Sequence, residues 1–360
     1  MIDDDNFPLF IEFPELKDIL PREKLIQKTP VQKMENLEAK IGAKYIWIKR
    51  DDKTTEIYGG NKPRKLEFIY ADCLKKGKSK IMTMGGIGSN HCLATAIFCQ
   101  QFNLKPILVL FHQPVTDDVK KKLLLYRYYG AEIVYNKSEV LSVLSYFTKQ
   151  RLTRKDTYFL FAGGTTSEST WGHINAACEL KEQIEAGDLV EPDLLFVTAG
   201  TTGTIAGLEA GLRLLDLKTK IIAVTVVPSI TYINALFSCE RLVKRIVNEA
   251  VKFVKKHVTK MKNFKYNPNF EVNTNYFGGK YGKVTDAGLN AINIVKETEN
   301  IQLDTTYTGK TFAALLDHVK THPDDKILFW NTYNSVELPD VEDKVNYKDL
   351  PKKLHEIYEK

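Results

Sequence analysis

Short apolar runs rich in β-branched residues alternate with longer helical patterns along most of this chain. The expected strands are Tyr45–Ile48, Lys80–Met84, Pro106–Phe111, Glu132–Tyr135, Thr157–Phe161, Leu194–Thr198, Ile221–Val227 and Ile327–Trp330. The expected helices include Pro63–Lys76, Asn90–Phe102, Asp117–Tyr129, Thr170–Ala186 and Thr204–Leu215. Strand–helix alternation of this length predicts an α/β fold, with open, twisted and mostly parallel sheets covered by helices on both faces.

Two sections depart from this alternation. The section from Thr231 to Asn275 is Lys-rich and then Asn-rich, and it is interpreted as an insertion or a lid-bearing excursion. Within it, the basic run Lys252–Lys265 is interleaved with apolar residues, which indicates the solvated face of an amphipathic helix rather than a polyanion site. The highly charged stretch Glu337–Lys360 is expected to form a peripheral helix or tail.

Charge and cysteine content narrow the possible partners and compartments. The 51 basic and 45 acidic residues give a net charge of +6, which is too weak to imply nucleic acid by itself. None of the five cysteines forms a Cys-x-x-Cys pair, and the histidines supply no metal-ligand spacing, so buried free thiols and no metal are expected. The acidic N-terminus has no apolar signal core, and no run reaches membrane-spanning length. We therefore expect a soluble, cytoplasmic protein without nucleic-acid or membrane partners.

Three glycine-rich turns follow expected strands. They are Gly85–Asn90, Gly163–Ser167 and Ala199–Thr204. Because ligands bind at the carboxyl ends of parallel strands, three such turns indicate a shared cleft. The third turn offers backbone N–H groups, hydroxyls and a helix dipole, and it lacks both nucleotide-binding signatures, so it fits a single phosphate ester. Close packing of strand and helix is the alternative for this turn. For Ser89 and Asn90 in the first turn, the alternative is a helix cap.

The segment Gly59–Lys65 places a lysine where a helix should begin. Pro63 suits the first helical position, so Lys62 sits at or next to the N-cap. A lysine held at such a position can act as an amine nucleophile toward a carbonyl. The commonest carbonyl partner of this kind is pyridoxal phosphate.

Five segments together carry a family resemblance. They are Lys49–Asp52 with Gly59–Phe68, Gly85–His91, Ala199–Leu208, Gly279–Gly282 and Leu303–Lys310. They occur in family order, and the similarity runs from about Thr29 to Ser335. On these residues the chain resembles the ACC deaminase/D-cysteine desulfhydrase family of fold-type II pyridoxal-phosphate enzymes, relatives of the tryptophan synthase β-subunit. The resemblance implies two domains with the cofactor in the cleft between them: a small α/β domain at 66–168, and a large domain formed by 1–65 and 169–360.

The resemblance also implies a role for individual residues. Lys62 would be the Schiff-base lysine, and Lys65 falls on the family's second lysine. Tyr281 and Tyr307 match the two active-site tyrosines, although each could instead be a buried aromatic with a satisfied hydroxyl. The remaining assignments concern binding. Asn90 would bind the cofactor's ring oxygen, and Asn90 and His91 would contact the substrate. Ser89 would bind the substrate carboxylate or help with proton transfer. The 5′-phosphate would be bound by Gly200, Thr201, Thr202, Gly203 and Thr204.

Two threonines distinguish the branches of the family. The ACC deaminase branch resembles Tyr-Glu-Gly-Lys after the second tyrosine, whereas this chain has Thr308, as the D-cysteine desulfhydrase branch does. Thr332 falls where that branch places a hydroxyl near the pyridine nitrogen. A neutral hydroxyl does not hold a proton on the ring as a carboxylate does, which suits loss of a good β-leaving group such as thiol. The favoured activity is D-cysteine desulfhydrase, a lyase giving pyruvate, sulfide and ammonia.

Several departures from the family pattern keep alternatives open. Gly88 replaces the usual Gln, and Tyr333 replaces a glycine near the ring. One alternative keeps the fold and changes the activity to ACC deaminase, a hydrolase, or to another D-amino-acid deaminase or racemase. A further alternative is a paralogue that binds pyridoxal phosphate without turnover. The base could be freed Lys62 or a tyrosinate. The resemblance also suggests a homodimer acting on a small amino acid.

Overall fold

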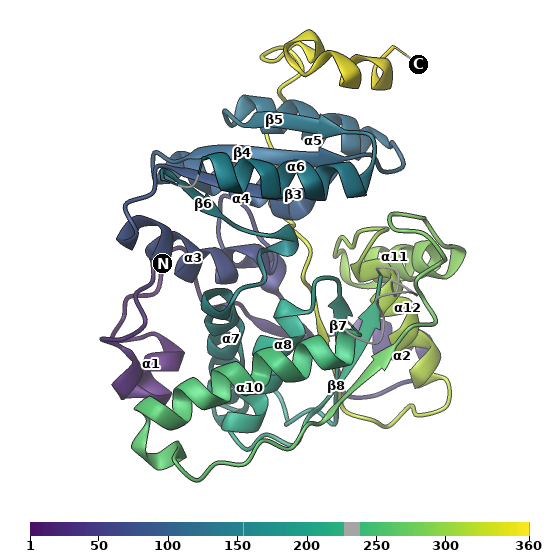
Figure 1. Ribbon diagram of the computed structural model, residues 1–360. Coiled ribbons are helices and arrows are strands. Elements are labelled where there is room, and N and C mark those ends of the chain that lie inside the picture. Colours follow the sequence, from purple (N-terminus) through teal and green to yellow (C-terminus); the bar gives the residue numbers. More distant parts are fainter. Residues whose placement is uncertain (154, 227–237, 360) are drawn as a thin grey trace. The chain divides into compact units, whose positions relative to one another are not determined.

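The structure is a computed structural model that describes residues 1–153, 155–226 and 238–359 (Figure 1). The end of the expected strand Ile221–Val227 and the start of the section Thr231–Asn275 lie outside the described residues. Internal contacts divide the chain into two compact units. Unit 1 comprises Met1–Phe68 and Ser167–Val336, and unit 2 comprises Ile69–Thr166 and Glu337–Lys360. The division expected from the resemblance stays a prediction, and it differs from these units chiefly in placing 337–360 with the large domain.

Unit 1 is built on a six-stranded sheet with the order β1-β2-β10-β7-β8-β9. Its strands are β1 (Val31–Lys33), β2 (Ile46–Lys49), β7 (Leu194–Ala199), β8 (Lys220–Thr225), β9 (Phe270–Asn273) and β10 (Ile327–Trp330). The β1–β2 pair is antiparallel and the other four pairs are parallel. Strand β10 thus lies between β2 and β7. Strands that are far apart in the sequence therefore end at the same edge of the sheet.

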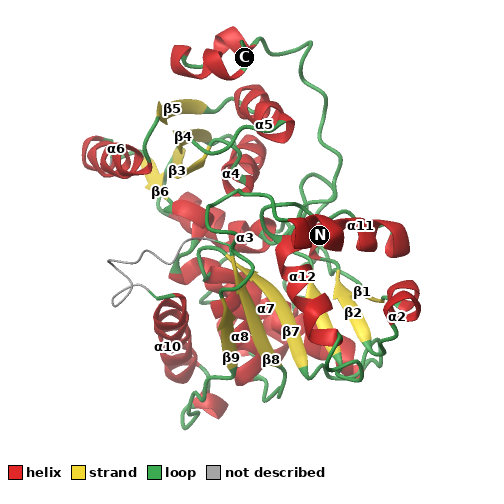
Figure 2. Cartoon of the chain, turned by 90° about the vertical axis from the view of Figure 1, so that its right-hand side faces the viewer, coloured by secondary structure: helices red, strands yellow, loops and turns green. Residues whose placement is uncertain are grey.

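The helices of unit 1 lie beside this sheet or pack on other helices of the unit (Figure 2). They are α1 (Pro8–Glu12), α2 (Glu35–Ile41), the start of α3 (Lys62–Lys75), α7 (Ser167–Glu185), α8 (Gly203–Leu214), α10 (Cys239–His257), α11 (Asp286–Glu299) and α12 (Thr308–Val319). Helices α7 and α8 approach closely at two glycines. A Cβ on Gly207 would lie 2.5 Å from the Cβ of His173, and one on Gly211 would lie 2.4 Å from that of Ala177.

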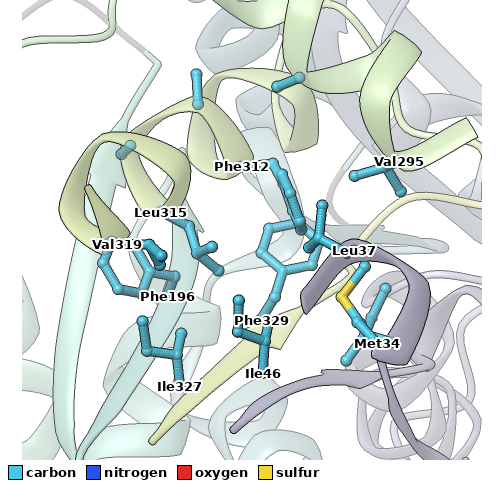
Figure 3. Packing of buried hydrophobic residues seen from close by; sticks show 14 of the residues in the cluster. Met34, Leu37, Ile46, Phe196, Val295, Phe312, Leu315, Val319, Ile327 and Phe329 are labelled. Carbon is cyan, nitrogen blue, oxygen red and sulfur yellow. The ribbon is translucent and has the colours of Figure 1, made fainter. Parts of the chain in front are cut away.

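An apolar cluster between the sheet and helices α2, α11 and α12 forms a core of unit 1 (Figure 3). Phe312 of α12 meets Phe329 of β10 edge to face, with ring centroids 4.8 Å apart. Met34 and Leu37 contribute from the start of α2, and Val295 contributes from α11. Burial of this many apolar side chains fixes α12 on the sheet, and α12 begins next to Tyr307.

Unit 2 holds a four-stranded parallel sheet with the order β5-β4-β3-β6. Its strands are β3 (Lys80–Gly86), β4 (Lys105–Phe111), β5 (Glu132–Asn136) and β6 (Thr157–Phe159), and its helices are the end of α3, α4 (Asn90–Gln101), α5 (Asp117–Tyr128) and α6 (Glu139–Leu152). The C-terminal segment belongs to this unit and forms 3-10 turns at Tyr347–Asp349 and Lys352–Ile357. Leu354 is buried there, and the Tyr358 hydroxyl donates to the Lys120 carbonyl at 2.7 Å.

The expected α/β architecture of two mostly parallel sheets is confirmed, with all eight expected strands present. The strands β1 and β9 were not expected, because both are short, carry polar residues and pair only at the sheet edges. Strand β9 also shows that the section Thr231–Asn275 is not only an excursion, since its end completes the sheet of unit 1. The basic run Lys252–Lys265 is α-helical only to His257, and a 3-10 turn follows at Thr259–Met261. Within the described part of the chain, no helix is long and apolar enough to cross a membrane.

Candidate active site

The turn before Lys62 is held by backbone hydrogen bonds to distant parts of unit 1. Helix α3 begins at Lys62 itself, one residue earlier than expected. The Gly60 N–H donates to the Asp51 carbonyl at 2.7 Å, and the Asn61 N–H donates to the Thr332 carbonyl at 3.2 Å. The Asn61 amide also donates to the Thr204 hydroxyl at 2.8 Å. Through Asn61, the structure therefore brings the Lys62 turn, the Gly200–Thr204 loop and Thr332 together.

The two glycines of this turn are required by its geometry. A Cβ on Gly59 would lie 1.8 Å from the Asp52 carbonyl oxygen. Gly60 has φ +89°, and a Cβ there would lie 2.7 Å from the Thr332 carbonyl oxygen. Neither clash involves a flexible side chain, so the backbone itself would have to move.

We predict that Gly59→Ala lowers the free energy of unfolding by about 2–3 kcal/mol, the usual cost of forcing atoms into a packed site. Gly200→Ala is the matched control, because a Cβ there meets only Tyr307 Cε1, at 3.9 Å, and its backbone is not left-handed. Urea denaturation of both variants measures the difference. Equal stability of the two variants would contradict the requirement for glycine at position 59.

The Gly200–Thr204 loop joins the end of β7 to the first turn of α8. Thr202 has φ +66° and, among the described residues, makes no side-chain cap bond to the helix. The first turn of α8 therefore presents backbone N–H groups without a side-chain acceptor from its N-cap residue, as an anion-binding helix start does. The space next to Gly200 is open, which leaves room for a ligand atom.

Tyr307 lies beside this loop and pairs with Tyr281. The two hydroxyls are hydrogen-bonded to each other, and the rings meet edge to face with centroids 6.2 Å apart. The nearest neighbour of a Cβ on Gly200 would be Tyr307 Cε1, at 3.9 Å. Two tyrosines that the sequence singles out among 17 thus form one pair next to the candidate phosphate loop.

The threonine that follows Tyr307 is fully buried. The Thr308 hydroxyl donates to the Asp304 carboxylate at 2.7 Å and accepts from the Asp304 N–H at 2.8 Å. Its side chain therefore fixes the start of α12. Thr332 is partly buried, and its carbonyl accepts the Asn61 N–H described above.

A buried ionic cluster supports the start of α3. Glu179 of α7 accepts hydrogen bonds from Lys49 Nζ at 2.6 Å and from Arg64 at 3.0 Å, and Arg64 also binds Asp51 at 2.7 Å. All four side chains are fully buried, and two cations balance two carboxylates. The Trp330 indole N–H donates to the same Asp51 at 2.7 Å. Helix α3 is thus joined to β2, α7 and β10 two residues after Lys62.

Electrostatics in this cluster favour the charged form of Glu179. Burial alone would raise the pKa of its carboxyl, but Arg64 and Lys49 outweigh burial and hold that pKa at about 2. Nothing in the sequence marked Glu179 as a partner, because it lies 115 residues from Arg64.

The second lysine of the motif lies away from solvent. Lys65 is buried, and burial, followed by the nearby charge of Lys62, lowers its pKa well below the usual value. His173 of α7 is also fully buried, and burial followed by the charge of Lys65 lowers the pKa of its imidazole well below the usual value. The side of α3 that carries Lys65 therefore favours neutral amines and imidazoles.

Unit 2 holds the expected binding residues at the start of α4. The Ser89 hydroxyl accepts the Cys92 N–H at 3.3 Å, so Ser89 acts as the helix cap, and Asn90 is the first helical residue. His91 is buried, and its Nε2 lies 2.9 Å from the Thr83 hydroxyl. The structure brings Ser89, Asn90 and His91 together within unit 2. Gly88 lies against α5, where a Cβ would be 2.7 Å from Val119 Cγ2.

Comparison with known proteins gives consistent matches over most of the chain. The family described as pyridoxal-phosphate dependent enzymes matches residues 22–332. A protein named putative 1-aminocyclopropane-1-carboxylate deaminase from Pyrococcus horikoshii is 32% identical over 332 residues, covering 91% of this chain and 93% of that protein. A protein named D-cysteine desulfhydrase from Serratia proteamaculans is 30% identical over 317 residues, covering 84% of this chain and 90% of that protein. The solved structure of an ACC deaminase homologue has a TM-score of 0.74 at 30% identity and covers 98% of both chains.

Proposed function

We propose that this chain, which belongs to the family of pyridoxal-phosphate dependent enzymes, is a lyase that removes the β-substituent of D-cysteine. The observation that carries the proposal is the junction at Asn61, which joins the Lys62 turn to the Gly200–Thr204 loop and to Thr332. A lysine, a helix start that can bind an anion and a threonine, brought to one junction of the backbone, are the kinds of residue that hold this cofactor. The donor set therefore fits pyridoxal 5′-phosphate.

Different residues would bind the different parts of the cofactor and the substrate. Lys62 would hold the cofactor covalently, and the backbone and hydroxyls of Gly200–Thr204 would bind its phosphate. Asn90 would bond the ring oxygen, and Thr332 would lie near the ring nitrogen. Ser89 and His91 would bind the substrate. When bound, pyridoxal phosphate supplies an electron sink for the negative charge that develops at the substrate α-carbon.

The protein's own groups would move the protons of the reaction. The amine of Lys62 would take the α-proton, or Tyr307 would do so as a tyrosinate. The hydroxyls of Tyr281 and Tyr307 are hydrogen-bonded to each other, and one of them could donate its proton to the leaving sulfur. Loss of sulfide and hydrolysis of the remaining product would give pyruvate and ammonia.

One expectation from the sequence, that the protein could be a hydrolase, is corrected by the comparisons. The family and the relatives named desulfhydrase support a lyase, so the hydrolase class implied by the deaminase branch is wrong. Relatives named as putative ACC deaminases match at 32% identity and relatives named D-cysteine desulfhydrase at 30% and 31%, so overall similarity does not separate the two activities. Thr308 favours the desulfhydrase, because the chain has no carboxylate at the position that distinguishes the deaminase branch. We also propose a cytoplasmic homodimer, with the small domain at 66–168.

We predict that the protein saturated with pyridoxal phosphate releases sulfide and a 2-oxo acid from D-cysteine, in equal amounts. L-cysteine, D-serine and 1-aminocyclopropane-1-carboxylate serve as matched substrates in parallel assays of 2-oxo acid. Product from the cyclopropane substrate but not from D-cysteine would replace the proposal with the deaminase. No product from any of the four would favour a paralogue that binds the cofactor without turnover.

A further inference from the structure

We propose that Lys310 is a positioning residue that ties the glycine-rich loop carrying Tyr281 to the helix that follows Tyr307. The inference rests on the proposed function, because it takes the tyrosine pair as part of the active site. Lys310 lies on α12, three residues after Tyr307, and its side chain is fully buried.

Tyr307 is held firmly by the residues around it. Asp304 accepts the N–H groups of Thr306 and Tyr307, each at 3.0 Å, and of Thr308 at 2.8 Å. A carboxylate that accepts three successive amides fixes the backbone at the start of a helix. Packing of α12 on the sheet through Phe312 adds a second restraint. The position of Tyr307 is therefore set by α12.

Tyr281 lies on a glycine-rich segment. Gly278, Gly279 and Gly282 all have positive φ, at +79°, +85° and +74°. Glycines in this region give the backbone wide conformational freedom, so a loop rich in them does not determine where its side chains lie. A restraint from outside the loop therefore helps to keep the Tyr281 and Tyr307 hydroxyls in contact.

Lys310 supplies that restraint at the beginning of the loop. Its Nζ donates to the Phe277 carbonyl at 2.8 Å and lies 5.9 Å from the centre of the Phe277 ring. A Cβ on Gly278 would lie 3.8 Å from the same nitrogen. The loop thus meets α12 at two points, through Phe277 on Lys310 and through Tyr281 on Tyr307. Because both points lie on one helix, Lys310 fixes the geometry of the tyrosine pair.

Removal of the Lys310 amine should affect catalysis more than folding. Proton transfer depends on heavy-atom separations near 3 Å, and a misplacement of about 1 Å can cost on the order of 100-fold in rate. Loss of one hydrogen bond to a loop carbonyl is small compared with the stability of a whole domain. Removal of the Lys310 amine should therefore loosen the loop and slow turnover while the protein stays folded.

The test compares Lys310→Met and Lys310→Arg with Lys296→Met, which makes the same change at an exposed lysine of α11. Hydrogen–deuterium exchange of the cofactor-free proteins measures loop freedom without any catalytic step. We expect exchange in 277–283 to rise at least about tenfold in Lys310→Met, as expected for an opened segment. Peptides from β7 should be unchanged, as should all peptides of Lys296→Met.

Kinetics with D-cysteine then separate positioning from a purely structural role. We expect kcat of Lys310→Met to fall about 10- to 100-fold with KM within about threefold, and Lys310→Arg to recover part of the loss. Loop exchange equal to the wild type, or a loosened loop with unchanged kcat, would overturn the proposal. If the wild-type protein does not act on D-cysteine, the proposed function fails, but the exchange experiment still decides whether Lys310 restrains the loop.

Discussion

Lys62→Ala should abolish the visible absorption of lysine-bound pyridoxal phosphate and lower kcat by at least about 10³-fold, the scale seen when a residue central to the chemistry is removed. Alanine cannot form the covalent bond and has no amine to take a proton. Helix α3 should persist, because Pro63 and the buried cluster at Arg64 remain in place. The measurement is a spectrum of each protein with pyridoxal phosphate, together with sulfide release from D-cysteine.

Lys75→Ala is the matched control for this prediction, because it removes an exposed lysine near the other end of the same helix. Its spectrum and rate should equal those of the wild type. Lys65→Ala tests the second lysine of the motif, which should keep the visible band because it does not hold the cofactor. A visible band retained in Lys62→Ala and lost in Lys65→Ala would transfer the covalent role to Lys65.

Local patterns predicted the strands, the helices and the turns of unit 1 well, whereas the roles of the site residues stay predictions. Each expected strand is a mainly apolar run, and such runs form strands where a sheet can bury them. The Lys62 turn could be predicted because Pro63 and the two glycines before it act within a few residues. The loop Gly200–Thr204 could be placed for the same reason, since it lies where a strand meets a helix.

The remaining features depend on contacts between distant residues. Glu179 gives no local signal, because on α7 it is one acidic residue among several, and only the fold brings it to Lys49 across 130 positions. Lys310 ends one of the segments that carry the family resemblance. Its partner is a backbone carbonyl 33 positions away, which no side-chain pattern can reveal. The edge strands β1 and β9 were missed because each becomes a strand only by pairing with a longer neighbour.

The buried cluster beneath α3 should dominate the response of unit 1 to mutation. We predict that Glu179→Gln lowers the free energy of unfolding by about 3–5 kcal/mol, the usual cost of breaking a buried ion pair. Glutamine keeps the shape of the side chain but leaves Lys49 and Arg64 facing the single carboxylate of Asp51. Glu182→Gln, on the same helix, is the matched control. It breaks a partly exposed pair with Lys28, and such pairs contribute at most about 1 kcal/mol.

The pKa of Glu179 determines whether the free energy of unfolding rises or falls with pH. Its pKa of about 2 in the folded protein lies below the value of 4.5 expected after unfolding, so the unfolded chain binds the proton more tightly. Stability from this group is complete above about pH 4.5 and is lost as the pH falls toward 2, by about 3 kcal/mol in total. Glu179→Gln lacks this contribution, so its free energy of unfolding should fall less steeply between pH 4.5 and 2.

A double variant that restores charge balance tests whether Glu179 stabilises the protein by its charge or only by its packing. Lys49→Met combined with Glu179→Gln again leaves one cation and one carboxylate, Arg64 and Asp51, in the buried cluster. The double variant should therefore be less destabilised than the sum of the two single variants, because residues in one ionic network do not act additively. Urea denaturation of the four proteins at pH 7 measures the coupling. Strict additivity, or a pH slope in Glu179→Gln as steep as in the wild type, would mean that Glu179 stabilises α3 by packing and not by its charge.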